Sequence, residues 1–150
     1  MAMLRAKGKL SVEPQKGRIS LNVSPDFCDY YAQFLIKRYW ILMQTPLHGS
    51  HITIYNDKLH ASTTNWRKAL CYHNKEIEFE YDENMIEGGF NKGFIMFWMR
   101  VYSKELEDFK RKVGVIETNT NYKGLHLTIC SAGKSGAKIV NWWPKTIELR

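Results

Sequence analysis

The sequence has little cysteine and no long apolar run. Its three cysteines, Cys28, Cys71 and Cys130, lie far apart, and no two of them form a C-x-x-C pair. This spacing predicts reduced thiols rather than disulfides or a zinc site. No apolar stretch approaches the roughly 20 residues that a membrane helix needs, and none follows the basic residues near the N-terminus, so we expect neither a membrane span nor a signal peptide. We therefore expect a soluble, cytoplasmic protein.

Acidic residues are in the minority, with 15 Asp and Glu against 22 Lys and Arg and a net charge of +7. This excess favours an anionic partner such as RNA, DNA or a nucleotide, although many basic proteins are merely soluble. The charges form no run of five of one sign, which excludes a basic tail. With 150 residues, 44% of them hydrophobic, the chain can form one domain, residues 1–150, around a core of its own.

Hydrophobic periodicity divides the chain into strands and helices. The predicted strands are 9–13, 18–23, 51–55, 76–81, 94–102, 137–143 and 146–150. The first two form a hairpin, and 94–102 is so apolar that we expect a central strand covered on both faces. The predicted helices are 25–40, 65–72 and 103–113, and residues 83–93 are predicted as a turn or loop. Ser103 and Gly114 suit the two ends of the helix at 103–113.

One short sequence motif occurs twice. Residues 49–55 read GSHITIY and residues 124–130 read GLHLTIC, so both contain Gly-x-His-aliphatic-Thr-Ile. Side chains alternate along a strand, so each copy places its histidine and threonine on one face and its aliphatic residues on the other. The residues on the polar faces are His51, Thr53, His126 and Thr128.

The two copies also share a context. A strand at 18–23 and a helix at 25–40 precede the first, and a strand at 94–102 and a helix at 103–113 precede the second. This order predicts an internal duplication with halves of about 18–56 and 94–131. Such a protein can bring one strand from each half to a shared cleft.

Two imidazoles and two hydroxyls facing one cleft suit phosphodiester chemistry. One histidine can take a proton from the attacking oxygen while the other protonates the leaving oxygen, and an imidazole pKa of about 6.5 suits both roles. The threonine hydroxyls can donate to the non-bridging phosphate oxygens, where charge builds up. No metal is required. The alternative is two ordinary strands whose polar faces match by chance.

The other histidines, the acidic residues and the glycine-rich segment are weaker candidates for a catalytic role. His48, His60 and His73 are interpreted as surface or loop residues, and Glu76, Glu78 and Glu80 as the solvent face of a strand. The segment AGKSGAK at 132–138 lacks the first glycine of a phosphate-binding loop. Trp98, inside an apolar strand, is interpreted as packing. Residues that could stack on nucleobases are Tyr81, Trp142 and Trp143.

With these motifs the chain resembles the 2H phosphoesterase superfamily, whose signature is two His-aliphatic-Thr/Ser-aliphatic motifs. Within it, the chain is most similar to the tailed-phage anti-CBASS nucleases. The resemblance extends over residues 24–129 and includes SPDFCDYYAQFLIKRYW, EIEFEYD and FWMRVYSKELEDF beside the two motifs. It implies an α+β fold that is bilobal and pseudo-symmetric, with two antiparallel sheets around a central cleft and a helix on each lobe.

The resemblance also implies an activity. Those nucleases cleave cyclic di- and trinucleotides that bacteria use as alarm signals, without metal or cofactor, and the ribose 2′-hydroxyl beside a 3′–5′ linkage is the expected nucleophile. Carried over, His51 and His126 form the acid–base pair, and Thr53 and Thr128 hold the scissile phosphate. The resemblance implies that Tyr81 matches one of the aromatic residues that sandwich the bases, and that Trp142 or Trp143 matches a C-terminal one. The protein would act in the host cytoplasm if a phage encodes it.

Two other functions remain open from the sequence. One is RNA end processing, in which an enzyme of the same superfamily acts on 2′,3′-cyclic phosphates or 2′–5′ linkages. The other is a non-enzymatic protein that sequesters a nucleotide or RNA through its basic and aromatic residues. The paired histidines count against the second, because binding alone does not need two imidazoles opposed across a phosphate.

Overall fold

Most of the regular structure is strand. The computed structural model describes residues 3–40, 43–46, 49–56, 64–91, 94–115, 124–132 and 146–148. The strands are β1 (Leu4–Glu13), β2 (Arg18–Asn22), β3 (His51–Asn56), β4 (Glu76–Asn91), β5 (Phe94–Tyr102), β6 (His126–Ala132) and β7 (Thr146–Glu148). The α-helices are α1 (Pro25–Tyr39), α2 (Trp66–Leu70) and α3 (Lys104–Val113). None of the helices in these ranges is both long and apolar enough to cross a membrane.

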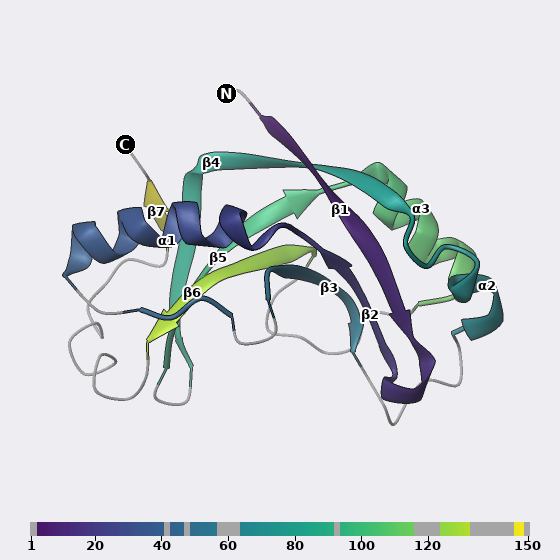
Figure 1. Ribbon diagram of the computed structural model, residues 1–150. Coiled ribbons are helices and arrows are strands. Elements are labelled where there is room, and N and C mark those ends of the chain that lie inside the picture. The colour runs from purple at the N-terminus through teal and green to yellow at the C-terminus, as the bar shows by residue number, and fades with distance from the viewer. Residues whose placement is uncertain are drawn as a thin grey trace.

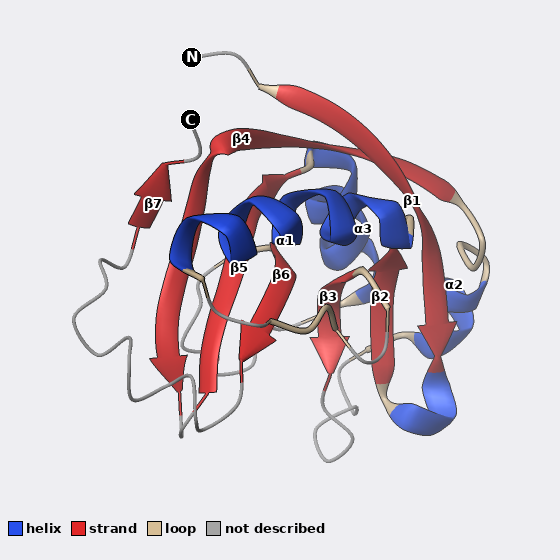
Figure 2. Ribbon diagram, turned by 60° about the vertical axis from the view of Figure 1, so that its left-hand side comes forward, coloured by secondary structure: helices blue, strands red, loops and turns tan. Residues whose placement is uncertain are grey.

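All the described strands belong to one antiparallel sheet. Its order is β1-β2-β3-β6-β5-β4-β7, and β1 pairs a second time, with β4. This second pairing closes β1, β2, β3, β6, β5 and β4 into a ring, while β7 lies beside β4 (Figures 1 and 2). The predicted hairpin of the first two strands is confirmed, with a 3-10 turn at Pro14–Lys16 between them.

The closed sheet shows that the bilobal α+β fold implied by the family resemblance is wrong. The protein is mostly β, and its strands form one sheet rather than two around a cleft. The reason is that β1 pairs with two strands, β2 and β4, and β4 pairs with three, β1, β5 and β7. β1 pairs with β2 through residues 9–13 and with β4 through residues 4–9. β4 continues to β5 through residues 80–91, with a break in register between Tyr81 and Ile86 where the strand bends (Figure 1).

The predicted loop at 83–93 is also wrong, because most of it belongs to β4. Residues 86–91 pair with residues 94–99 of β5. Gly88 and Gly89 are typical of turns, but here they pair with Phe97 and Met96 of the long apolar strand β5, which keeps the backbone extended. This extra length lets β4 reach both β1 and β5.

Two strand–helix–strand units stand on either side of the contact between β3 and β6. One consists of β2, α1 and β3, and the other of β5, α3 and β6. In each unit the two strands pair with one another, and the sheet order places β3 next to β6. The repeated His-x-Thr strands are therefore immediate neighbours in the sheet.

The two longer helices lie where the periodicity predicts them. The Ser103 hydroxyl accepts a hydrogen bond from the Leu106 N–H at 3.2 Å, and Gly114 ends α3 with a φ of 73°. α1 buries Cys28, Tyr31 and Leu35 in the core and packs against β6. The Cys28 thiol donates to the Thr128 carbonyl at 3.3 Å, so α1 lies behind one of the repeated motifs.

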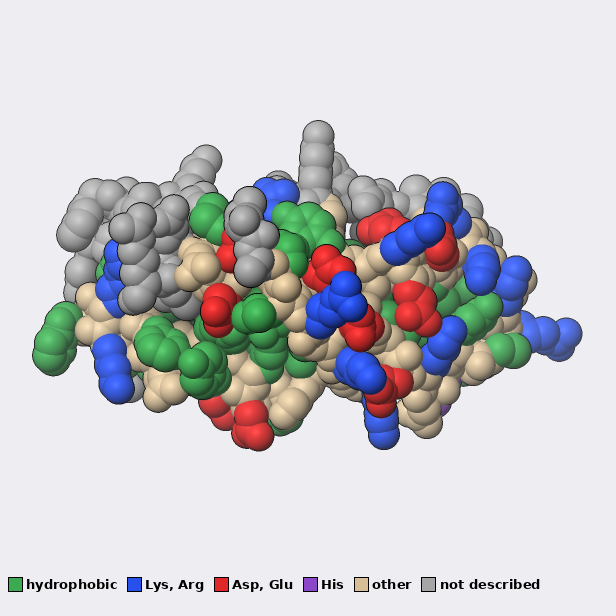
Figure 3. Space-filling view, turned by 90° about the horizontal axis from the view of Figure 1, so that it is seen from above, with side chains coloured by type: hydrophobic (Ala, Val, Ile, Leu, Met, Phe, Trp, Pro, Cys, Tyr) green, Lys and Arg blue, Asp and Glu red, His purple; other side chains and the backbone are tan. Residues whose placement is uncertain are grey.

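The upper surface is divided into an apolar and a charged part (Figure 3). Hydrophobic side chains gather over α1, where Tyr30 and Phe34 are exposed. Basic and acidic side chains mix over β1 and β4, where Arg5 and Lys7 pair with the predicted solvent face formed by Glu76, Glu78 and Glu80. These exposed ion pairs contribute little stability each.

We predict that Gly8→Ala destabilises the closed sheet. Gly8 lies where β1 changes its partner from β4 to β2, and an added Cβ would stand 2.7 Å from the Asn22 carbonyl oxygen and 2.8 Å from Leu21 Cγ. Because that oxygen is backbone, relief requires the strands to shift, at a cost of about 1–3 kcal/mol. The measurement is urea unfolding, with exposed Lys7→Ala as the control that stays within about 0.5 kcal/mol. A Gly8→Ala protein as stable as the wild type would contradict the close approach of Gly8 to Asn22 and Leu21.

Candidate active site

The pairing of β3 with β6 places each histidine beside the threonine of the other motif. Ile52 is paired with Leu127 in an antiparallel register. The residues on either side of this pair then match His51 with Thr128 and Thr53 with His126. Directly opposite side chains have Cβ atoms about 4.5–5.5 Å apart, and diagonal neighbours such as the two histidines are separated by about 7–8 Å. The four polar groups thus form one compact cluster.

Burial alternates over residues 51–54 and 126–129 as the sequence predicts. The four side chains of the cluster are half-buried. Their aliphatic neighbours are buried: Ile52, Leu127 and Ile129 are fully buried and Ile54 is 8% exposed. The cluster is consequently held on strands whose other face packs into the core, where α1 also lies.

The glycine that begins each motif orients its histidine. Gly49 and Gly124 have φ values of 80° and 92°, which favour glycine because they lie in the left-handed region. The Gly49 carbonyl lies 2.8 Å from His51 Nδ1, and the backbone of Gly124 acts on the His126 ring and favours its protonated form. A carbonyl only accepts, so Nδ1 of His51 carries the proton and Nε2 is left for chemistry.

His126 has a lowered pKa. Burial of the ring is the largest cause, and the positive charges of His51 and Arg100 act in the same direction. The backbone of Gly124 and the negative charge of Glu87 oppose it and raise the pKa. The lowered pKa keeps the His126 imidazole neutral at physiological pH, the form that accepts a proton.

Two residues of β5 extend the cluster: Trp98, which is interpreted from the sequence as packing, and Arg100, which sequence reasoning did not identify. Trp98 is paired with Thr128 and Arg100 with His126. Paired residues share a face of the sheet, so both point to the side of the histidines. Arg100 and Tyr102 are exposed, so the prediction that β5 is covered on both faces is wrong for its C-terminal end. An arginine inside an otherwise apolar strand is the signal that could have found this residue.

Glu87 of β4 connects these two residues. Its carboxylate accepts a hydrogen bond from Trp98 Nε1 at 3.1 Å and one from Arg100 Nε. The bond with Glu87 raises the pKa of Arg100. Glu87 lies in the segment predicted as a loop, so its position in β4 and its role could not be seen from the sequence.

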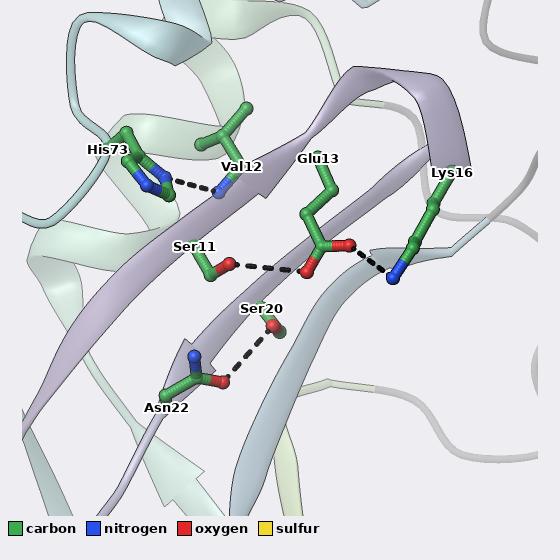
Figure 4. A network of polar contacts seen from close by, with 7 residues as sticks. All are labelled: Ser11, Val12, Glu13, Lys16, Ser20, Asn22 and His73. Atoms are coloured by element: carbon green, nitrogen blue, oxygen red, sulfur yellow. Dashed lines mark hydrogen bonds and ion pairs between the residues drawn. The ribbon is translucent and has the colours of Figure 1, made fainter. Parts of the chain in front are cut away.

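On the other side of the cluster, β2 contributes small polar residues. Asn22 is paired with His51 and Ser20 with Thr53. The Ser20 hydroxyl donates to Asn22 Oδ1 at 3.4 Å (Figure 4). The cluster therefore continues across β2, β3, β6, β5 and β4. His73 lies apart from it, where its Nδ1 accepts a hydrogen bond from the Val12 N–H at 3.0 Å (Figure 4).

The structure does not bring Tyr81 to the histidines. Tyr81 is paired with Val101, which faces away from Arg100 on β5, and it is 8% exposed. Its ring packs edge-on against Phe27 of α1 with centroids 4.9 Å apart. Tyr81 is thus buried on the core face, where a residue of α1 packs against its ring. Trp142, Trp143, His48 and His60 lie outside the described residues, as do residues 133–138 of the glycine-rich segment.

Within the described ranges, no three or more His, Cys, Asp or Glu side chains gather as they would around a metal ion. The cluster instead combines two imidazoles, two hydroxyls, a guanidinium and a carboxylate. Such a set can move protons and stabilise negative charge.

Comparisons with known proteins add no assignment. The chain matches no family model, no curated protein and no solved structure. The chemical meaning of the cluster therefore rests on its geometry.

We predict that acidification weakens the folded state through His126. The unfolded histidine takes up a proton near pH 6.5, whereas the lowered pKa makes the folded one resist it. Stability is therefore constant above about pH 6.5 and is lost as the pH falls through the lower folded pKa, by about 1.4 kcal/mol for each unit of pKa difference. Ring titration by NMR and urea unfolding against pH measure this, and His126→Gln should remove it. A His126 pKa at or above about 6.5 in the folded protein would contradict the burial of its ring.

Proposed function

We propose that this protein is a metal-independent phosphodiesterase that opens the 3′–5′ linkages of cyclic di- and trinucleotides. The observation that carries the proposal is the cross-strand arrangement in which His51 lies beside Thr128 and His126 beside Thr53. The proposal rests on this cluster and on the motif resemblance. It does not rest on the fold, which differs from the one the resemblance implied.

In the proposed reaction the substrate supplies its own nucleophile. One histidine takes the proton of the ribose 2′-hydroxyl, whose oxygen attacks the adjacent phosphorus. The other histidine protonates the departing 5′-oxygen, and the product is a 2′,3′-cyclic phosphate. The lowered pKa of His126 suits the base, which leaves His51 as the acid. Thr53 and Thr128 donate to the non-bridging oxygens, where charge increases in the transition state.

The positive charge of the chain supports an anionic substrate. The net charge is +7, and the cluster contains Arg100 next to His126. The resemblance to nucleases that destroy bacterial alarm nucleotides favours cyclic oligonucleotides over long RNA. RNA end processing uses the same two histidines, and it is distinguished from the proposal by the substrate that is cut.

We predict turnover of at least one cyclic di- or trinucleotide in the presence of EDTA, because imidazoles carry out both proton transfers. The assay offers cyclic dinucleotides, cyclic trinucleotides and linear RNA with a 2′,3′-cyclic end, and mass spectrometry identifies the products. His51→Ala and His126→Ala should each lower the rate by roughly 10²–10⁴-fold, and Thr53→Ala or Thr128→Ala by less.

The matched control is His73→Ala, which removes a histidine outside the cluster and should leave turnover near the wild-type rate. If only the RNA with a 2′,3′-cyclic end is converted, the protein is an RNA end-processing enzyme instead. Loss of activity in EDTA that a divalent ion restores would refute the metal-independent reaction. Near-normal rates in both His51→Ala and His126→Ala would refute the acid–base pair.

We predict that the 2′-deoxy analogue of the preferred substrate binds but is not cut. Base stacking and phosphate contacts do not depend on the 2′-hydroxyl, whereas the intramolecular attack requires it. Calorimetry measures binding and mass spectrometry measures cleavage. Comparable cleavage of the ribose and deoxyribose compounds would make water the nucleophile, even if both histidines prove essential.

A further inference from the structure

Arg100 and Glu87 form a charged pair beside the two histidines that the proposed reaction does not yet use. Arg100 is paired with His126 on the neighbouring strand β6, and its side chain is 52% exposed. Glu87 is the more buried partner, with 22% of its side chain exposed. The pair thus lies at the edge of the histidine cluster, with its cation toward solvent.

Glu87 holds Arg100 through a single donor of the guanidinium. The carboxylate accepts from Arg100 Nε with one oxygen and from Trp98 Nε1 with the other. Trp98 is itself 8% exposed and belongs to the strand that carries Arg100, so the carboxylate is bound at both oxygens to β5. A guanidinium has four further N–H donors beyond Nε, arranged to match two oxygens of a phosphate.

We propose that Arg100 binds the non-bridging oxygens of the scissile phosphate between His51 and His126, and that Glu87 is the positioning residue that aims it. This inference rests on the proposed function, since it names the cation of the same site. Negative charge on those oxygens grows as the 2′-oxygen attacks, and a fixed guanidinium stabilises it without reorganisation. Arg100 would therefore act more strongly on the transition state than on the bound substrate.

The test uses Arg100→Gln, Arg100→Lys and Glu87→Gln in the full chain. Arg5→Gln is the matched control: Arg5 is also an exposed arginine on a strand and also pairs with carboxylates, Glu78 and Glu80, but on the β1–β4 side of the sheet. Losing one transition-state donor costs roughly 10²–10³-fold in kcat. Arg100→Gln should show this loss with a smaller change in KM, and Arg100→Lys and Glu87→Gln should lose less. A kcat within about threefold of the wild type in Arg100→Gln would overturn the proposal.

The pKa of His126 shows whether Arg100 and Glu87 act on the site through their charges or only support the fold. The groups that act on this ring are His51 on β3, Arg100 on β5, Glu87 on β4 and the backbone of Gly124. By NMR, Arg100→Gln should raise the pKa of His126 and Glu87→Gln should lower it, while Arg5→Gln leaves it unchanged. Shifts in the same direction in Arg100→Gln and Glu87→Gln would overturn the placement of the pair.

Binding of inorganic phosphate separates this proposal from the proposed function. Phosphate is titrated into each variant and followed through the ring signals of His51 and His126. Arg100→Gln should weaken binding at least about fivefold relative to both the wild type and Arg5→Gln, because a charged donor is lost. If the wild type cuts no substrate of the panel, the proposed function fails while this loss still supports Arg100 as the anion-binding residue. Equal phosphate affinity in Arg100→Gln and Arg5→Gln would overturn the anion-binding role of Arg100.

Discussion

The pairing of Ile52 with Leu127 joins the two halves of the sheet, and the candidate site depends on it. This pairing brings together two strands that are 75 positions apart in the sequence. Because both side chains are fully buried, the core holds the register that sets His51 beside Thr128 and Thr53 beside His126. A shift by one residue would turn the histidines toward the core and the aliphatic side chains toward solvent, at a large cost in buried area.

The closed sheet makes this arrangement rigid and extends it. The strands on either side of the pair, β2 and β5, are themselves paired outward with β1 and β4, and β1 pairs with β4 to complete the ring. Successive strands therefore supply a row of polar side chains that ends in the Arg100–Glu87 pair. Gly49 and Gly124, both with positive φ, add a local constraint, since the Gly49 carbonyl lies within hydrogen-bond distance of the His51 ring. Sites built on strands in this way need little reorganisation when a ligand binds.

The elements were predictable where local chemistry decides them. The helices α1 and α3 follow from their apolar spacing, and Ser103 and Gly114 mark the ends of α3. The fold was not predictable, because β1 pairs with both β2 and β4 while β4 also pairs with β5, and no local pattern encodes these pairings. Reading residues 83–93 as a loop removed the part of β4 that carries Glu87. The local pattern also places Tyr81 at the end of its strand, whereas β4 continues to Asn91 and the Tyr81 ring packs against Phe27 of α1.

The sequence by itself determined that His51, Thr53, His126 and Thr128 lie on the polar faces of two amphipathic strands. Alternation along a strand is a property of the backbone, and the repeated glycine marks both motifs. Only the tertiary structure decided that these strands are direct neighbours in one closed sheet, and that Arg100, Trp98 and Glu87 stand beside them. The reason is that cross-strand pairing joins residues far apart in the chain, and it is selected by the packing of the whole core rather than by any short segment.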